Sequence, residues 1–356
     1  VVFVHRQLCA LKHNCLYCSL FIAKGGTTSL TLSMASSASP ETYLFEDKPL
    51  DDYENKMMGT LRKKFAGRDG AISDSYALMF VRGYRNEKKP EEETLKKYEE
   101  MLQTRSELKI DKILDSYPEG YEKYNEIYKI GILGNTKEGR PVYYERLGLL
   151  TPKAVNEFGY EKFKRCHIRM QEEIRVRKEI LSRKMGSRIF KHVVVLDMDG
   201  FGVRCIAPKI IRKLKSLITF DSDMYPESLI RLYIVNAPWI FEKGWALIKG
   251  IIHKATQQKI RIIGKKKEKI LTKLAKEIKL EEIPDFLGGG NSKALPGICS
   301  LEFKELLKEA SATSKPKAGK CDSESVKPNT VSSVSSSSYS TSIEPTTPVT
   351  PGGPKK

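Results

Sequence analysis

The apolar positions between residues 50 and 105 recur with the period of an α-helix. Helix-start signals stand at Ser73-Asp74 and at Pro90, which three glutamates follow. The pattern predicts a small helical subdomain. Its apolar positions fall at three- and four-residue spacing in three groups: Leu61 and Phe65; Tyr76, Phe80 and Val81; Leu95, Tyr98 and Leu102.

After Tyr128 the spacing of apolar residues changes from helical to β-like. Residues 130–133 and 139–145 are predicted to form two antiparallel strands, joined by a polar loop that contains Gly134-Asn135. Thr151-Pro152 then signals the start of a helix, and a longer helix is predicted over about residues 161–184.

Three short apolar runs follow, rich in β-branched residues and separated by helix-length segments. They cover residues 192–197, 231–236 and 259–264. Because strand and helix alternate, the sequence predicts an α/β layer architecture with a largely parallel sheet.

The two ends of the chain differ in composition from the middle. Residues 1–40 contain no Asp or Glu and become rich in Ser and Thr. We expect a disordered or non-native leader, with Met34 as a candidate start, and a targeting segment is the alternative. Residues 311–356 have almost no large apolar side chains, which predicts a disordered Ser/Thr/Pro-rich tail. The folded part then divides into a helical subdomain, 41–115, and a second domain, 116–310.

Charge and cysteine content narrow the classes of function. The chain of 356 residues has 62 basic and 44 acidic residues, and no apolar run reaches the length of a membrane span. Twelve basic and two acidic residues lie between 243 and 279, so anionic lipid is a candidate partner; no recognition motif supports nucleic acid. The exposed basic run is predicted at Lys265, Lys266, Lys267, Lys269 and Lys273.

The seven cysteines are scattered and odd in number, which favours a reducing compartment over a disulfide framework. Cys15 and Cys18 have the spacing of a zinc or redox pair, but no second cysteine pair follows them. A closed zinc site needs four ligands, so no metal is predicted there.

The strand that ends at Asp197 admits two interpretations. Asp197-Met-Asp199-Gly200 resembles the first motif of haloacid-dehalogenase-type phosphatases, in which the first carboxylate is the nucleophile and a Mg²⁺ ligand. Such an enzyme also needs a later acidic pair, and none follows the later strands. The sequence therefore favours a carboxylate that caps a turn.

Both tryptophans lie in one stretch, Trp239 to Trp245, which continues to Ile252 as a predicted amphipathic helix. Such a stripe is ordinarily core. Flanked by Lys243, Lys249 and Lys254, it also fits a helix that enters a lipid headgroup region.

Several motifs, in order and spacing, resemble the CRAL-TRIO lipid-binding domain in its Sec-fourteen-like branch of phosphatidylinositol transfer proteins. The resemblance covers about residues 50–290. It rests on Phe80-Val-Arg-Gly-Tyr-Arg85, Gly139-Arg-Pro-Val-Tyr-Tyr-Glu-Arg-Leu-Gly148, Leu196-Asp-Met-Asp-Gly200, Tyr225-Pro-Glu-Ser-Leu229, Tyr233-Ile-Val-Asn-Ala-Pro238 and Ile283-Pro-Asp-Phe-Leu-Gly-Gly289.

This resemblance implies a mixed sheet with helices around an apolar pocket that holds one phospholipid under a gating helix. It places the inositol phosphate on Arg82, Glu227, Thr256 and Lys259. Arg and Lys neutralise phosphate, Thr donates to it, and Glu accepts from inositol hydroxyls or orients the lysine. The gate and membrane contact are expected at Trp239, Phe241, Trp245, Ile248 and Ile252.

The family's phosphatidylcholine site is only partly kept. His192 and Val194 stand where the family has Ser and Thr, and Tyr143 is retained. These three residues are the pocket candidates. The second ligand is therefore expected to be a different lipid or a sterol-like molecule.

We therefore expect a non-enzymatic, cytoplasmic protein that carries phosphatidylinositol between membranes or presents it to a phosphoinositide kinase. It would need no cofactor, metal or nucleic acid, and it would associate peripherally with anionic membranes, Golgi or endosomal by resemblance. Two alternatives stay open: a carrier of a smaller apolar ligand of the retinoid or tocopherol type, and the Mg²⁺-dependent phosphatase.

Overall fold

The computed structural model describes residues 48–68 and 73–313. The expected leader, the Cys15/Cys18 pair and almost all of the expected tail lie outside these residues. None of the described helices is long and apolar enough to cross a bilayer.

Three helices form the N-terminal part of the described chain, as their periodicity predicted: α1 (Asp52–Lys64), α2 (Asp74–Gly83) and α3 (Pro90–Glu107). Asp51 and Glu54 form a capping box at the start of α1. Pro90 and the glutamates after it occupy the first turn of α3. Buried Met57, Phe80 and Tyr98 join the three helices in one apolar cluster.

A five-stranded sheet forms the centre of the second part. The strands are β1 (Ile130–Asn135), β2 (Pro141–Glu145), β3 (His192–Asp197), β4 (Leu229–Val235) and β5 (Ile260–Ile262). Their spatial order follows the chain; β1 is antiparallel to β2 and the other neighbours are parallel. The predicted mixed α/β architecture is confirmed. The strand expected at 259–264 is shorter, because Lys259 caps the preceding helix instead.

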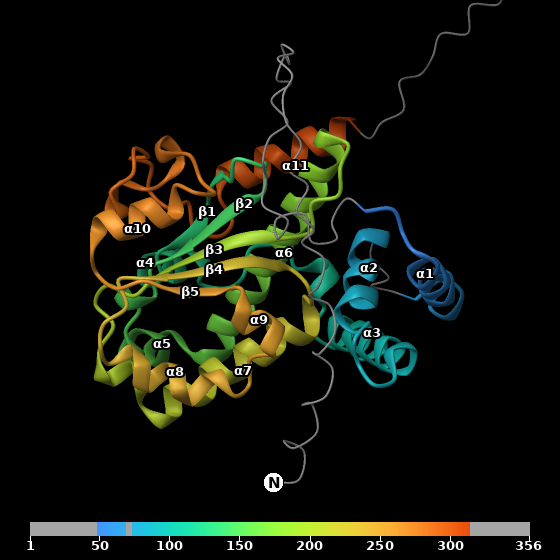
Figure 1. The fold of residues 1–356 in the computed structure, drawn as a ribbon, viewed down its shortest axis with the longest axis horizontal. Coiled ribbons are helices and arrows are strands. Elements are labelled where there is room, and N and C mark those ends of the chain that lie inside the picture. The colour runs from blue at the N-terminus through green and yellow to red at the C-terminus, as the bar shows by residue number, and fades with distance from the viewer. Residues whose placement is uncertain (1–47, 69–72, 314–356) are drawn as a thin grey trace, which may run out of the picture. The chain divides into compact units, whose positions relative to one another are not determined.

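Helices cover both faces of this sheet (Figure 1), with α10 (Lys267–Leu274) on the face opposite α5, α7 and α8. The long helix predicted at 161–184 is present as α6. The remaining elements are η1 (Ile110–Lys112), α4 (Tyr121–Ile127), η2 (Leu147–Leu149), α5 (Pro152–Phe158), α6 (Tyr160–Met185), η3 (Val203–Ile206), α7 (Pro208–Met224), α8 (Phe241–Lys249), α9 (Lys254–Gln258), η4 (Leu280–Glu282), η5 (Asp285–Leu287) and α11 (Leu301–Thr313).

Alternate residues of β3 face different surroundings. Val193 and Val195 belong to a packed cluster with Ile270 and Leu274 of α10. Val194 and Leu196 point to the other face, where they line a cavity. Because side chains alternate along a strand, one sheet supports both a solid core and a hollow.

Asp197 ends β3 as a structural corner. Its Oδ1 accepts from the backbone N–H of Asp199 at 3.0 Å and from Asn236 Nδ2 at 2.8 Å. Its Oδ2 accepts from Arg146 Nε at 3.2 Å. A Cβ on Gly148 would lie 1.9 Å from the Asp199 carbonyl oxygen, so only glycine allows the two chain segments to cross there.

These contacts confirm the turn interpretation of Asp197, because both carboxylate oxygens hold the local backbone and side chains together. Within residues 48–68 and 73–313 no group of three or more His, Cys, Asp or Glu side chains is placed to hold a metal ion.

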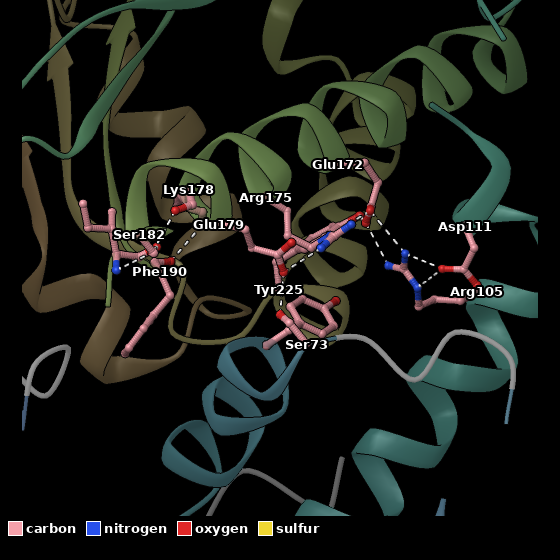
Figure 2. A network of polar contacts seen from close by, with 12 residues as sticks. Ser73, Arg105, Asp111, Glu172, Arg175, Lys178, Glu179, Ser182, Phe190 and Tyr225 are labelled. Carbon is pink, nitrogen blue, oxygen red and sulfur yellow. Dashed lines mark hydrogen bonds and ion pairs between the residues drawn. The ribbon is translucent and has the colours of Figure 1, made fainter. Parts of the chain in front are cut away.

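A buried ionic network joins the N-terminal helices to α6 (Figure 2). Glu172 accepts from Arg105 at 2.8 and 3.2 Å, from Arg175 at 2.8 Å and from the Tyr225 hydroxyl at 2.8 Å. The side chains of Arg105 and Glu172 are each 1% exposed. Burial alone would raise the pKa of Glu172, but the Arg175 and Arg105 guanidiniums outweigh burial and lower it to about 2.

We predict that Glu172→Ala lowers the free energy of unfolding by about 3 to 5 kcal/mol, because two guanidiniums lose their buried partner. Denaturant unfolding measures this loss, and Glu157→Ala on the exposed face of α5 is the control. The depressed pKa also means that the stabilisation is present above the unfolded pKa near 4.5 and is lost as pH falls toward 2. A variant as stable as the wild type, with the same acid profile, would contradict this role.

Candidate functional site

A large cavity lies on the face of the sheet that α5, α7 and α8 cover. Its volume is about 1890 Å³, well above the roughly 300 to 1,000 Å³ of pockets for drug-sized ligands. Its wall is mostly apolar and comes from strands and helices alike, including Val194, Leu196, Ile234, Phe201, Phe241 and Ile248. The space suits a ligand with long apolar chains.

All four residues predicted to bind a headgroup line this one cavity. Arg82 comes from α2, Glu227 precedes β4, Thr256 lies in α9, and Lys259 follows α9. The four come from segments up to 177 residues apart in the sequence. The structure thus brings together every position named for phosphate and inositol, and their binding role stays a prediction.

Glu227 is held between two lysines. Its Oε2 accepts from Lys191 Nζ at 2.9 Å and from Lys259 Nζ at 3.4 Å. Burial would raise the pKa of Glu227, but the two ammonium groups lower it overall; burial lowers the pKa of Lys259. Glu227 also has a φ of 54°, a left-handed conformation that is uncommon for a non-glycine residue and costs free energy.

Lys191 is a residue that sequence reasoning missed. It is buried, yet its ammonium group bonds the carboxylate that was assigned to the headgroup site. The sequence carried only a weak signal, a lysine placed directly before a buried strand within a basic stretch.

Arg82 is also paired, but one of its donors is left over. Its Nε and Nη2 donate to the two Glu54 carboxylate oxygens at 2.8 and 3.3 Å. Its Nη1 is buried and has no hydrogen-bond partner among the described residues. Glu54 therefore fixes the guanidinium and leaves an N–H group unsatisfied at a cavity-lining residue.

Of the three pocket candidates, His192 and Val194 line the cavity and Tyr143 does not. Tyr143 shares a sheet face with Val194, but it packs among Phe163 and Ile174 of α6, which cover it. The prediction was wrong for Tyr143, because strand alternation shows on which face of the sheet a side chain lies but not which helix packs over that side chain.

His192 is a neutral, polar part of the cavity wall. Burial and the nearby Lys178 hold its pKa well below the ordinary value. Its Nδ1 lies 3.4 Å from Lys178 Nζ, and an ammonium group only donates. Nδ1 is therefore the acceptor, and the neutral ring carries its proton on Nε2.

The gate expected between Trp239 and Ile252 has two apolar sides. Phe241, Trp245, Ile248 and Ile252 line the cavity, as expected. Trp239 precedes α8 instead of lying in it, and it is 74% exposed. Leu247 and Ile251 are exposed as well, and the sequence analysis did not single them out.

The five lysines of the predicted basic patch are all exposed. They lie before and along α10, whose Ile270 and Leu274 pack on the sheet face opposite the cavity. The patch is therefore near α8 in sequence but on the other face of the sheet (Figure 1).

Polar side chains deep in the cavity wall were also missed. Glu145, His167, Gln171 and Asp221 line it, together with Tyr128. Glu145 lies in a motif that carried the family resemblance, whereas His167, Gln171 and Asp221 lie in helical segments with many other polar residues.

Comparison with known proteins gives matches over most of the described chain. Residues 125–289 match the CRAL/TRIO domain model. The phosphatidylinositol/phosphatidylcholine transfer protein SFH9 of Arabidopsis thaliana is 30% identical over 284 residues, covering 75% of this chain and 48% of that protein. The Sec14 cytosolic factor of Schizosaccharomyces pombe is 30% identical over 166 residues, covering 46% and 56%.

The fold has a solved counterpart in the crystal structure of Sfh5, with a TM-score of 0.55 at 19% identity, over 75% of this chain and 99% of that one. The chain spans about half the length of the curated relatives it matches. Residues 125–289 thus match a CRAL/TRIO domain, and the chain is similar to Sec14-like phosphatidylinositol transfer proteins.

Proposed function

We propose that this protein binds phosphatidylinositol in the cavity and exchanges it between membranes, without making or breaking a bond. The observation that carries the proposal is the cavity itself, which joins a large apolar volume to the charged and polar side chains of Arg82, Glu227, Thr256 and Lys259. Relatives named as phosphatidylinositol/phosphatidylcholine transfer proteins support the same assignment.

The headgroup chemistry follows from the charged and polar groups that line the cavity. The Arg82 guanidinium and the Lys259 ammonium group would attract the phosphate, and the Thr256 hydroxyl would donate to it. Glu227 keeps the two lysines close together without a ligand, and with one it would accept from inositol hydroxyls.

Two further parts of the proposal concern organisation. The helical subdomain, 41–115, and the lipid-binding domain, 116–310, would act as one binding unit, because Arg82 of the first lines the cavity of the second. The protein would work in the cytoplasm, dock on anionic Golgi or endosomal membranes, and present lipid to a phosphoinositide kinase.

Membrane contact would use the outer side of the gate. Trp239, Leu247 and Ile251 are exposed, while Phe241 and Ile248 face inward. Opening would let the inner side chains leave the cavity for lipid instead of water.

We predict that Lys259→Ala and Glu227→Ala each reduce phosphatidylinositol transfer between vesicles at least about tenfold, because each removes a charged side chain that would hydrogen-bond the lipid headgroup. Mass spectrometry of co-purified lipids should show less phosphatidylinositol in both variants. Lys123→Ala, an exposed lysine of α4, is the matched control. Normal transfer by both folded variants would refute the headgroup assignment, and a retinoid or tocopherol in the wild-type preparation would favour the smaller ligand.

We predict that Trp239→Ala weakens binding to vesicles and slows lipid loading, with no loss of stability, because this side chain is exposed in the free protein. Co-sedimentation with vesicles measures the change. Leu301→Ala is a matched control, since Leu301 is 73% exposed on another element. If the two variants bind alike, the gate does not contact the membrane through Trp239.

We predict that replacing Lys265, Lys266 and Lys267 together by Gln weakens binding to anionic vesicles, by about 1 kcal/mol for each lysine near the surface. Added salt should weaken the wild type and have a smaller effect on the variant. Equal binding and equal salt dependence would show that this patch faces solvent when the protein is docked.

A further inference from the structure

The cavity has a second polar region besides the one formed by Arg82, Glu227 and Lys259. Glu145 ends β2 and pairs in register with Leu196, four residues along β3 from His192. Four residues of a strand span about 13 Å, which is the distance along β3 from His192 to Leu196, the partner of Glu145. The other polar residues here are His167 and Gln171 of α6 and Asp221 of α7. They interrupt an otherwise apolar wall.

The hydrogen-bonding capacity of these residues is only partly used within the protein. The buried Tyr128 hydroxyl donates to Glu145 Oε2 at 2.8 Å, which leaves Oε1 as an acceptor toward the cavity that Glu145 lines. Burial raises the pKa of Glu145 overall, and the nearby His167 and the Tyr128 hydroxyl oppose that rise. The Tyr128 hydrogen bond thus holds one oxygen of Glu145 in place.

His167 and Asp221 form a separate pair beside this carboxylate. His167 Nε2 lies 2.9 and 3.0 Å from the two Asp221 oxygens. Burial lowers the pKa of His167, but Asp221 and Glu145 outweigh burial and raise it, which favours the imidazolium. The pair is close to neutral, so Glu145 and the Gln171 amide remain the groups with hydrogen-bonding capacity for a ligand.

We propose that Glu145 and Gln171 bind the hydroxyl group of an uncharged lipid held inside the cavity. A hydroxyl both donates and accepts; Glu145 offers an acceptor and the Gln171 amide offers donors. An anionic group would be repelled by the Glu145 carboxylate, and a quaternary ammonium has no N–H to give to it. A polar group in an apolar chamber is costly unless it is paired, so a hydroxyl there gains a partner that the chamber otherwise lacks.

This inference rests on the proposed function only in that the cavity holds lipid. The test uses the full chain and phosphatidylcholine vesicles that contain dioleoylglycerol or its acetylated counterpart, at equal mole fraction. Protein is re-isolated and its bound lipid is measured by mass spectrometry. The wild type should load the free-hydroxyl lipid about tenfold better than the acetylated one, the value of a hydrogen bond to a charged group.

Glu145→Leu should abolish this preference. Because that change also leaves the Tyr128 hydroxyl without its acceptor, Gln171→Leu is the second variant, and Glu157→Leu on α5 is the control. Equal loading of the two lipids by the wild type overturns the proposal, and so does a preference that survives both cavity variants. If the two variants instead lose bound phosphatidylcholine, the site binds a cationic headgroup and the proposal is overturned.

Phosphatidylinositol added to the same vesicles separates the two proposals. A wild-type protein that loads no phosphatidylinositol refutes the proposed function, whatever its preference for the hydroxyl. A protein that loads phosphatidylinositol but shows no such preference refutes only the second site.

Discussion

One face of the mixed sheet packs in a solid core and the other lines a cavity, and the rest of the structure depends on that difference. Val193 and Val195 are sealed against α10, whereas Val194 and Leu196 line a void. An apolar void forfeits the dispersion contacts that a filled core would make, and its cost grows with its volume. On the proposed function, a lipid in this cavity of about 1890 Å³ would act as part of the core and would stabilise the protein.

The headgroup region differs from the apolar wall, because it holds cationic side chains that are largely removed from water. Glu227 bridges Lys191 and Lys259 and keeps their repulsion in check, at the expense of a left-handed backbone. Arg82 is held by Glu54 in the same manner. On the proposed function, a phosphate bound here would supply the negative charge that these carboxylates supply without it, so binding would exchange one ionic arrangement for another and desolvate few new charges.

The sequence predicted the elements that local patterns determine, and it failed where distant segments decide. Strand and helix positions followed from periodicity, and the set from Arg82 to Lys259 followed from family motifs. Lys191 was missed because its partner is 36 residues away, and His167 because Asp221 is 54 residues away. Tyr143 was misplaced since α6 covers it, and Trp239 was put in the helix that begins only at Phe241. Lys191, His167 and Tyr143 each depend on a residue or helix that is distant in sequence, and a local pattern does not contain that information.

The proposed gate has apolar side chains on both its inner and its outer side, and this arrangement bears on how it would open. Phe241 and Ile248 are buried toward the cavity, while Trp239 and Leu247 already face outward. In water, opening would expose the inner set and cost free energy in proportion to its apolar area. Against a bilayer that cost largely disappears, because acyl chains replace the cavity wall. Gly244 lets α8 rest close on η3, since a Cβ there would lie 2.9 Å from the Ile206 Cγ2. Helix α8 is thus closely packed on η3, and on the proposed function a membrane would supply the condition for its release.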